Sequence, residues 1–381
     1  SWNGSFGAFC GILRPCPQIQ VGYLGLFLRS KGYRQKISDL AAGTNINNLK
    51  AEHFSEIFVP LPPLAEQRRI VEKLDAVLGK VDACRQRLER IPTILKRFRQ
   101  SVLAAACSGK LTADWREGNT DNDDLPAGWE WKELLELIPK GGIFDGPFGS
   151  NLKTSDYATE GIRVVRLENI GHLEFFADKQ SFISKEKFEQ LKKHEVFAGD
   201  IIFSSFIADE IRVTILPEIP TGAIAKADCF CIRPSTDIVT IEYLTIQLAC
   251  QNSYNQLVEK VHGATRPRVN TTQLRSLKLR VCSIPEQEEI VRRVNALFAL
   301  ADNLETRYQK AKVHVDKLTQ SVLAKAFRGG LVPTEAELAK LDGREYEPAS
   351  VLLERIQAER ETQPKTARKK ATQKRAGKNP S

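Results

Sequence analysis

Apolar residues recur at a spacing of seven in two stretches of this 381-residue chain. The first stretch holds two such sets, which are Leu74, Val81, Leu88, Leu95 and Val102, and Ile70, Val77, Cys84, Ile91 and Phe98. The second stretch holds Val294, Ala301, Tyr308, Val315 and Val322, and Ile290, Leu297, Leu304, Ala311 and Leu318. Paired sets sustained over about five heptads are typical of a coiled-coil seam, whereas a single amphipathic helix on a globular core has a wider apolar face. We therefore predict two long helices that form a coiled coil.

The two stretches are copies of one internal repeat, separated by 220 residues. The segment LAEQRRIV at 64–71 recurs as IPEQEEIV at 284–291, and QSVLA at 100–104 recurs at 320–324. Two similar domains on one chain imply pseudo-twofold symmetry, which the two helices satisfy only by running antiparallel. Each helix is expected to span roughly 40 residues, or about 60 Å. Pro92 lies in the first copy alone, so we expect a kink there that the second copy lacks.

Similarity between the copies extends upstream of each helix. An alternating apolar pattern is shared by Phe54, Ile57, Val59 and Leu61 and by Leu274, Leu277, Leu279 and Val281. The alternation predicts a strand that leads into each helix. Residues 1–61 are therefore expected to be the end of a domain whose complete counterpart is 126–281. The chain opens on Ser1 without an initiating methionine, and we expect a preceding part to be missing.

Residues 126–281 alternate short apolar strands with Gly, Asn and Asp turns and a few helices, which predicts a mixed α+β domain of ordinary size. The predicted organisation has seven segments. They are 1–61, the remnant of a first α+β domain; 62–111, a first long helix; 112–125, a linker; 126–281, a second α+β domain; 282–331, a second long helix; 332–361, a helical segment; and 362–381, a disordered basic tail.

The formal net charge of +9 suggests a polyanionic partner, but most of it lies in one place. Residues 362–381 contain seven basic residues and no acidic ones. A tail of this composition is expected to be disordered. It either adds nonspecific attraction to phosphates or merely solvates the end of the chain, and the sequence favours neither.

Two loops of the predicted domain carry recognition chemistry. The glycine-rich loop at 140–153 contains Ser150, Asn151 and Lys153, which suit phosphates or base edges. The loop at 262–270 contains Arg266 and Arg268 around a proline, so the arginines are expected to be exposed and able to reach guanine or phosphate. Weaker candidates are Arg212 and Lys226. Taken alone, the first loop is more typical of an ordinary glycine-rich turn, and single basic residues are usually solvated surface.

Catalytic motifs are missing from the sequence. It contains no phosphate-binding loop of the Walker type, no dinucleotide-binding glycine motif and no Asn/Asp-Pro-Pro-aromatic motif of amino-methyltransferases. The five histidines stand apart from one another, and no cysteine pair has zinc spacing. We expect a non-catalytic protein without metal or cofactor, with its eight cysteines reduced in the cytoplasm. The apolar runs are shorter than the ~20 residues of a membrane span.

Several segments together resemble the specificity subunits of type I restriction-modification enzymes. They are PLPPLAEQRRIV at 60–71, RQSVLAAACSGKL at 99–111, LPAGW at 125–129, GDIIFSS at 199–205 and EPASVLLERI at 347–356. The resemblance covers nearly the whole chain, and the repeated entry into the helix is its most specific element.

The resemblance implies two target-recognition domains that each read one half of a split DNA site, held apart by two antiparallel helices. It implies docking of two methylase subunits, and an assembly with ATP-dependent restriction subunits. Adenine methylation from S-adenosylmethionine and DNA cleavage would belong to those partners. The chain departs from the family in lacking most of the first recognition domain, so one half-site is expected for it.

The main hypothesis is thus a DNA-specificity subunit, with no cofactor of its own. The alternative is a non-catalytic coiled-coil scaffold that binds no specific DNA sequence, its loops being mere turns. A third hypothesis is an enzyme with a degenerate motif in residues 126–281. The target base sequence does not follow from the chain, since assigning side chains to bases requires groove geometry.

Overall fold

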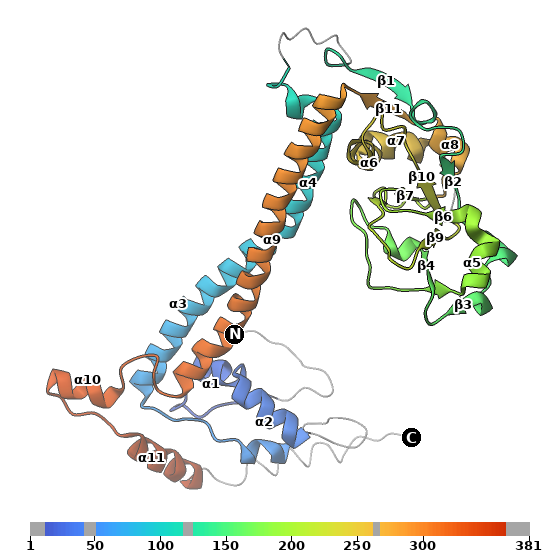
Figure 1. Cartoon of the computed structure of the whole chain (residues 1–381). Coiled ribbons are helices and arrows are strands. Elements are labelled where there is room, and N and C mark those ends of the chain that lie inside the picture. Colours follow the sequence, from blue (N-terminus) through green and yellow to red (C-terminus); the bar gives the residue numbers. More distant parts are fainter. Residues whose placement is uncertain (1–11, 42–50, 117–124, 262–266, 363–381) are drawn as a thin grey trace, which may run out of the picture. The chain divides into compact units, whose positions relative to one another are not determined.

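The computed structural model describes residues 12–41, 51–116, 125–261 and 267–362 (Figure 1). The chain divides into two compact units, unit 1 being Ser1–Arg90 with Arg307–Ser381 and unit 2 being Ile91–Thr306. Within the described ranges, no helix is long and apolar enough to cross a membrane.

All regular secondary structure in the described part of unit 1 is helical. Its elements are α1 (Val21–Leu28), α2 (Lys31–Ala41), the 3-10 turn η1 (Ala51–Glu56), α3 (Leu64–Leu88), the second part of α9 (Ile284–Phe327), α10 (Glu335–Asp342) and α11 (Ala349–Thr362). A core cluster joins Leu74 of α3 to Leu323 and Ala326 of α9. Further along α3, Arg85 Nε lies 3.5 Å from Asp316 Oδ1 of α9. Later α3 residues thus contact earlier α9 residues, so the two helices run antiparallel in this unit.

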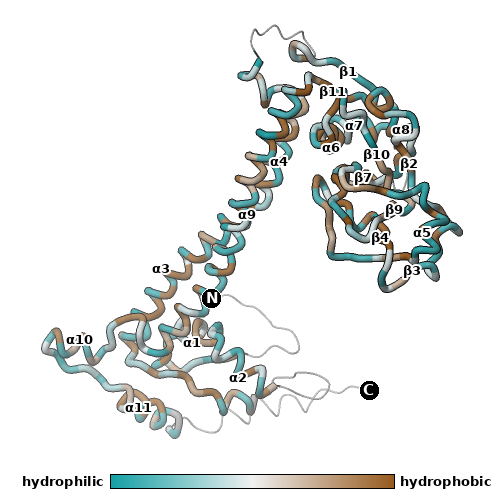
Figure 2. Tube along the Cα trace, viewed as in Figure 1, coloured by the Kyte–Doolittle hydropathy of each residue, from teal (hydrophilic) through white to brown (hydrophobic). Residues whose placement is uncertain are grey.

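Unit 2 contains the matching helix pair. Helix α4 (Ile91–Cys107) runs beside the first part of α9, and the turn η2 (Lys110–Thr112) follows it. Arg99 Nη2 lies 2.6 Å from Asp302 Oδ1, and Arg293 Nη1 donates to the Leu111 carbonyl at 2.8 Å. The order is again antiparallel, which confirms the predicted direction. Figure 2 shows hydrophobic and hydrophilic positions alternating along α4 and α9.

Three small sheets make up the rest of unit 2. The first pairs β1 (Glu130–Glu133) with β11 (Lys278–Val281). The second has the order β2-β10-β7-β8 and the third the order β3-β5-β4-β9-β6, in which only β4 and β9 are parallel. The strands are β2 (Ile143–Phe144), β3 (Tyr157–Ala158), β4 (Ile162–Val165), β5 (Phe182–Ile183), β6 (Glu195–Val196), β7 (Ile201–Ser204), β8 (Val213–Ile215), β9 (Ala223–Ala225) and β10 (Cys229–Ile232).

Helices and single turns connect these strands. They are α5 (Lys185–Leu191), α6 (Ile241–Ala249), α7 (Gln251–Lys260), α8 (Thr271–Arg275), η3 (Leu134–Leu137), η4 (Gly149–Asn151), η5 (Thr154–Asp156), η6 (Leu167–Asn169) and η7 (Lys192–His194). One core cluster combines Leu103 of α4, Phe203 of β7, Leu244 of α6 and Ile290 of α9. The predicted α+β class is confirmed, because strands and helices share this core.

The kink expected near Pro92 takes the form of a break in the helix, which the second copy lacks. Helix α3 ends at Leu88 and α4 begins at Ile91, whereas α9 continues over 44 residues. Pro92 is the second residue of α4, where its missing N–H has no carbonyl partner to lose. The proline therefore begins a helix rather than bending one.

The predicted heptad seam is narrower than the two sets suggested. Leu74, Val81, Leu95 and Val102 of the first copy are buried, and so are Val294, Ala301 and Tyr308 at the same heptad position of the second copy. In the second set, Cys84 and Leu304 are exposed, and these two residues are equivalent in the repeat. One of the two heptad positions thus carries most of the burial.

The prediction of a strand before the first helix is wrong. Phe54 lies in η1, and residues 57–63 have no regular structure. Its counterpart β11 is a strand because β1 pairs with it. A strand requires a partner for its backbone groups, and the described residues of unit 1 provide none to Ile57–Leu61.

Two glutamines show the repeat at the level of single hydrogen bonds. Gln67 accepts from Gln20 N at 2.9 Å and donates to the carbonyls of Gln18 and Pro62 at 3.2 and 2.9 Å. Gln287 accepts from Thr240 N at 2.8 Å and donates to the carbonyls of Ile238 and Cys282 at 3.0 and 2.8 Å. Every partner of Gln287 lies 220 residues after the matching partner of Gln67. The two copies therefore enter their helices through the same buried contacts.

Candidate nucleic-acid interface

A glycine brings the first predicted recognition loop against the strand end that carries Lys226. A Cβ atom on Gly146 would lie 2.1 Å from the backbone carbon of Lys226, so no other residue fits without a backbone shift. Gly146 thus lets the loop approach the protein's own backbone, which fixes the position of the segment that follows.

Asp145 ties the same two segments together. Its Oδ1 accepts from Gly146 N at 2.7 Å and from Asp228 N at 3.0 Å. Burial raises the pKa of the Asp145 carboxyl to about 6, while the Gly146 hydrogen bond and the nearby Arg268 charge act in the opposite direction. The Asp145 carboxylate therefore joins the loop of Gly146 to the loop of Asp228, and its burial costs free energy because water no longer solvates the charge fully.

Asp228 is the ionic partner of Arg268, which the sequence predicts to contact DNA. The two side chains form an ion pair, and Asp228 Oδ1 also accepts from Ser205 Oγ at 3.1 Å. Asp228 has a positive φ of 73°, a conformation that aspartate and asparagine tolerate better than most residues. Its contacts with Arg268, Ser205 and Asp145 hold this strained backbone conformation in place. Strained conformations of this kind cluster at functional sites.

Two aromatic rings flank the Arg268 guanidinium. The guanidinium carbon lies 5.4 Å from the ring centre of Phe206 and 5.8 Å from that of Phe148. Arg268 also pairs with Phe206 as an isolated antiparallel bridge, which fixes its backbone. The side chain remains 47% exposed. Arg268 is thus held in one orientation and still open to solvent.

A pocket of about 520 Å³ lies beside this arginine and is lined by two more predicted residues, Arg212 and Lys226. Arg212 donates to the Leu167 carbonyl at 3.1 Å and to Ser204 Oγ at 3.0 Å. Arg166 also lines the pocket, and Lys226 and Arg166 both lie over the Tyr157 ring, at 5.5 and 5.8 Å.

The cluster of Phe148, Arg166, Phe206, Arg212, Lys226 and Arg268 is called the basic-aromatic cluster below. It combines guanidinium and ammonium groups with flat apolar surface, the chemistry that binds phosphates and base edges. Glu168 and Asp228 also line the pocket, so the cations are oriented by acidic partners rather than left in an open cationic field.

The remaining predicted residues lie near the cluster in sequence but are not joined to it. Ser150 and Asn151 are exposed in η4, and Lys153 is exposed at the start of η5, where its backbone N–H donates to Asp156 Oδ2 at 2.7 Å. Arg266 lies outside the described residues. These positions stay predictions.

Sequence reasoning missed Phe148, Arg166, Phe206 and Asp228. A signal existed for Phe148, which stands between Pro147 and Gly149 in the loop already singled out. Nothing in the sequence marks the other three, because they come together only where loops distant in the chain converge.

The described histidines of unit 2 make structural contacts. His172 Nδ1 lies 2.8 Å from the Ile211 carbonyl, and His194 Nδ1 lies 2.7 Å from the Asp145 carbonyl. Burial lowers the pKa of His194. Across the described parts of the chain, no group of three His, Cys, Asp or Glu side chains could hold a metal ion.

The fold and the cluster together define a candidate nucleic-acid-binding protein built on an antiparallel helix pair. A family model for the type I restriction modification DNA specificity domain matches residues 4–93 and 126–313. The chain belongs to this family.

Two curated relatives agree with the family match. The type I restriction enzyme EcoKI specificity subunit of Escherichia coli (strain K12) is 36% identical over 363 residues, which are 93% of this chain and 75% of that protein. The StySPI specificity subunit of Salmonella potsdam is 38% identical over 381 residues, which are 96% of this chain and 78% of that protein. The expected family is therefore confirmed.

Solved structures share the fold at lower identity. A chain from a study of complex assembly and conformational transition of the type I R-M system has a TM-score of 0.60 at 20% identity, covering 81% of this chain and 71% of that chain. The crystal structure of the HsdS subunit from Thermoanaerobacter tengcongensis has a TM-score of 0.50 at 21% identity, covering 82% and 71%. These likenesses support the α+β fold with its long helices.

Proposed function

We propose that unit 2 reads one half of a split DNA site, and that this chain is the specificity subunit of a type I restriction-modification complex. One observation carries the site assignment: Arg268 is oriented by Asp228, flanked by Phe148 and Phe206, and still open to solvent. A pre-oriented guanidinium can form the bidentate contact to guanine O6 and N7 that is the commonest specific contact to DNA.

The other cations have a different role in this proposal. Arg166, Arg212 and Lys226 line one pocket and suit the phosphates that flank the base that Arg268 reads. Ser150, Asn151, Lys153 and Arg266 are proposed to make further contacts with the duplex. Contacts to phosphates would set register and affinity, and Arg268 would set sequence preference.

The helix pair is proposed as a spacer of fixed length between half-site readers. Two readers on a stiff spacer select half-sites at a set separation, as dimeric readers do with half-sites one turn of about 34 to 36 Å apart. In this proposal the chain has the seven segments that its sequence predicts. Two methylase subunits would dock on the outer helix faces and restriction subunits would join the assembly. The chain itself would be non-catalytic, without a cofactor, and cytoplasmic.

The test is a competition experiment on the complex assembled from this chain and its cognate methylase. The target is first mapped from methylated adenines in the host genome, and short duplexes with and without that half-site then compete for the complex. We expect specific binding to exceed nonspecific binding by at least about 10³-fold. Equal binding of all duplexes would end the proposal.

The scaffold hypothesis makes the opposite prediction. It requires that substitution of Lys153 or Arg268 leaves DNA affinity and partner binding unchanged. The family match and the named relatives favour the DNA-specificity role over this alternative.

A further inference from the structure

Arg163 of β4 is a buried cation that forms no ion pair with any residue that the structure describes. It is only 5% exposed, and its Nε is buried without a hydrogen-bond partner. Burial lowers the pKa of its guanidinium, while the charge of Glu168 acts in the opposite direction. Glu168 itself pairs with Arg166 Nη1 at 3.3 Å. A buried charge costs free energy unless an opposite charge accompanies it, so the missing partner requires a physical reason.

Holding the neighbouring loop does not explain the charge of Arg163. Its Nη2 donates to the carbonyls of Ala177 and Lys179 at 3.2 and 2.7 Å. Asn169, which is fully buried, holds the same loop with a neutral amide, since its Nδ2 donates to the carbonyls of Phe176 and Lys179 at 2.8 and 2.9 Å. The loop carbonyls need donors rather than a positive charge. The charge of Arg163 is therefore available to a ligand.

The Arg163 side chain lines a pocket of about 300 Å³ in unit 2. The guanidinium carbon lies 5.7 Å from the ring centre of Phe182, which also lines the pocket. Gln180 and Thr221 contribute an amide and a hydroxyl. Most of the remaining wall is apolar and consists of Phe175, Pro217, Ile219 and Pro220. An apolar pocket with a few convergent polar groups is the usual form of a small-molecule site.

The charges around the pocket select the class of anion. Among the described residues that line it, Arg163 is the only cation, and the carboxylate of Glu218 lines it as well. A doubly charged phosphate would be repelled by Glu218 with a single cation to offset the repulsion, whereas a carboxylate carries one charge. A guanidinium N–H forms a charge-assisted hydrogen bond to a carboxylate oxygen, and the apolar wall suits a hydrocarbon body.

We propose that this pocket binds a monocarboxylate with a small apolar body, whose carboxylate accepts from Arg163 Nε and whose hydrocarbon part contacts Phe175 and Phe182. The anion supplies the charge that Arg163 lacks among its neighbours. No residue of the basic-aromatic cluster lines this pocket, so the site is separate from the candidate DNA interface and does not depend on DNA reading.

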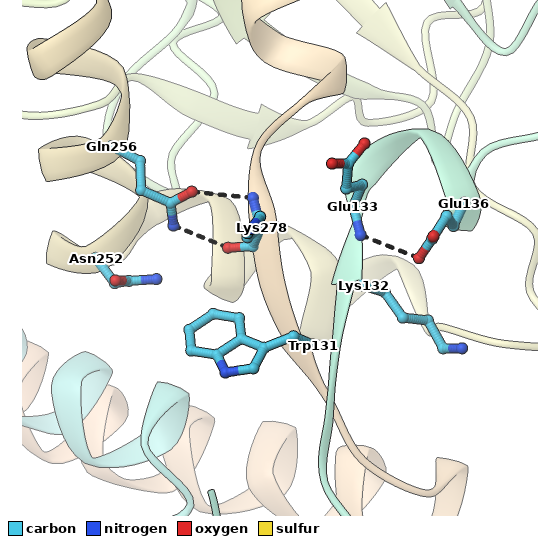
Figure 3. A pocket seen from close by; sticks show the side chains of 7 residues that line it. All are labelled: Trp131, Lys132, Glu133, Glu136, Asn252, Gln256 and Lys278. Carbon is cyan, nitrogen blue, oxygen red and sulfur yellow. Dashed lines mark hydrogen bonds between the residues drawn. The ribbon is translucent and has the colours of Figure 1, made fainter. Parts of the chain in front are cut away.

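Another pocket of unit 2 contains cations but lacks a buried one without a partner. Lys278 lines this second pocket with an exposed side chain, and Gln256 bonds to the backbone of Lys278 at 2.9 and 3.0 Å (Figure 3). Lys132 lines it too, and its Nζ lies 2.8 Å from Glu130 Oε1. These cations are solvated or paired, so they require no anion. Lys278 therefore provides a matched position for a control.

The probe is butanoate, titrated into the full chain labelled with nitrogen-15 and followed by the arginine Nε–H signals. The signal that is missing in the Arg163→Lys chain identifies Arg163. We expect this signal to shift saturably with butanoate and to stay in place with butanamide, which has a similar shape without the charge. Acetate should bind roughly tenfold more weakly than butanoate, because it has two fewer CH₂ groups to contact the apolar wall.

Two substitutions that each remove one positive charge separate the site from general charge effects. Arg163→Gln should weaken butanoate binding by about tenfold or more, while Lys278→Gln should leave it unchanged, as measured by titration calorimetry. Because Arg163→Gln also alters the loop contacts, Glu218→Gln tests the pocket without them. Glu218 is exposed, and removing its repulsive charge should tighten butanoate binding by about twofold or more.

Four results would overturn the proposal. They are an Arg163 signal that butanoate does not move, equal binding of butanoate and butanamide, tighter binding of inorganic phosphate than of butanoate, and weaker butanoate binding by the Glu218→Gln chain. A short DNA duplex that moves the Arg163 signal and displaces butanoate would also overturn it, since Arg163 would then bind a phosphate of the DNA backbone.

Discussion

Arg116 and Glu286 form a buried ion pair in unit 2, with Arg116 Nη1 2.6 Å from Glu286 Oε1 and side chains only 10% and 5% exposed. Glu286 also accepts from Thr112 Oγ1 at 2.7 Å and from Trp129 Nε1 at 3.1 Å. The glutamate that opens the second copy of the repeat motif, equivalent to Glu66 in the first copy, thus joins the start of α9 to the chain that follows α4.

Replacing Arg116 with alanine should destabilise unit 2 by about 3 kcal/mol, because the glutamate would remain buried without its cation. Urea unfolding followed by tryptophan fluorescence measures the loss, since Trp129 bonds to the same carboxylate. Arg355→Ala is the matched control, because its pair with Glu347 is about half exposed and worth under ~1 kcal/mol. Similar losses in the two variants would contradict the importance of the buried pair.

The spacer helices and the repeat could be predicted from the sequence, because heptad spacing is a local pattern that survives without knowledge of neighbours. The strand at Phe54–Leu61 could not, since its formation depends on a partner that the described residues of unit 1 lack. The same pattern in Leu274–Val281 contributes to β11 because β1 is there. Apolar alternation therefore showed that the two segments have similar side chains, but not whether a neighbouring strand is present to pair with each.

The candidate site was predicted in part. Arg268 and Lys226 were found because basic residues in loops are visible in a sequence. Asp228 and Phe206 were not, because they approach Arg268 only after three segments of the chain have folded together. The close contact of Gly146 with the Lys226 backbone was not predicted either, because it forms only when two loops distant in the sequence meet.

Asp228→Asn should reduce base discrimination without unfolding the site. Asparagine tolerates the positive φ at this position and retains an oxygen for Ser205, but it removes the charge that orients Arg268. We expect a loss of about tenfold in the preference for the cognate base at one position of the half-site, and Arg268→Ala should relax the same position by about 1–3 kcal/mol.

A panel of duplexes with each base at every position measures this effect. Because Asp228 acts through Arg268, the double variant should be no worse than Arg268→Ala alone. Additive losses, or relaxed preference at two different positions, would show that Asp228 does not orient Arg268.

Lys226→Ala and Arg166→Ala should weaken DNA binding equally for cognate and unrelated duplexes. Each variant loses one phosphate contact, so the slope of log affinity against log salt concentration should become shallower by about one. Titrations at several salt concentrations give the slope. Lys192→Ala is the control, since Lys192 is an exposed lysine of unit 2 that lies outside the basic-aromatic cluster. An unchanged slope in both test variants would remove these residues from the phosphate-binding role.

Asp145 should make the stability of unit 2 depend on pH. Burial raises its pKa from 3.8 to about 6, so the folded protein binds this proton more tightly than the unfolded chain. The stabilisation from the protonated form is complete below about pH 4 and is lost as the pH rises through about 6.

Asp145→Asn keeps an oxygen for the N–H groups of Gly146 and Asp228 but cannot ionise. Relative to this variant, the native chain should lose roughly 1–2 kcal/mol of unfolding free energy between pH 4 and pH 7, a range that allows for partial solvent exposure of the carboxyl. Urea unfolding at a series of pH values measures the difference.

Asp156→Asn provides a control of opposite sign in the adjoining segment. The backbone N–H of Lys153 lowers the pKa of Asp156, and Lys187 acts in the same direction. Its contribution to stability is therefore present above the unfolded pKa and is lost as the pH falls through the folded value. The native chain should gain stability over Asp156→Asn as the pH rises from acid and lose stability relative to Asp145→Asn over the same interval. Parallel pH profiles for the two variants would show that burial does not dominate at Asp145.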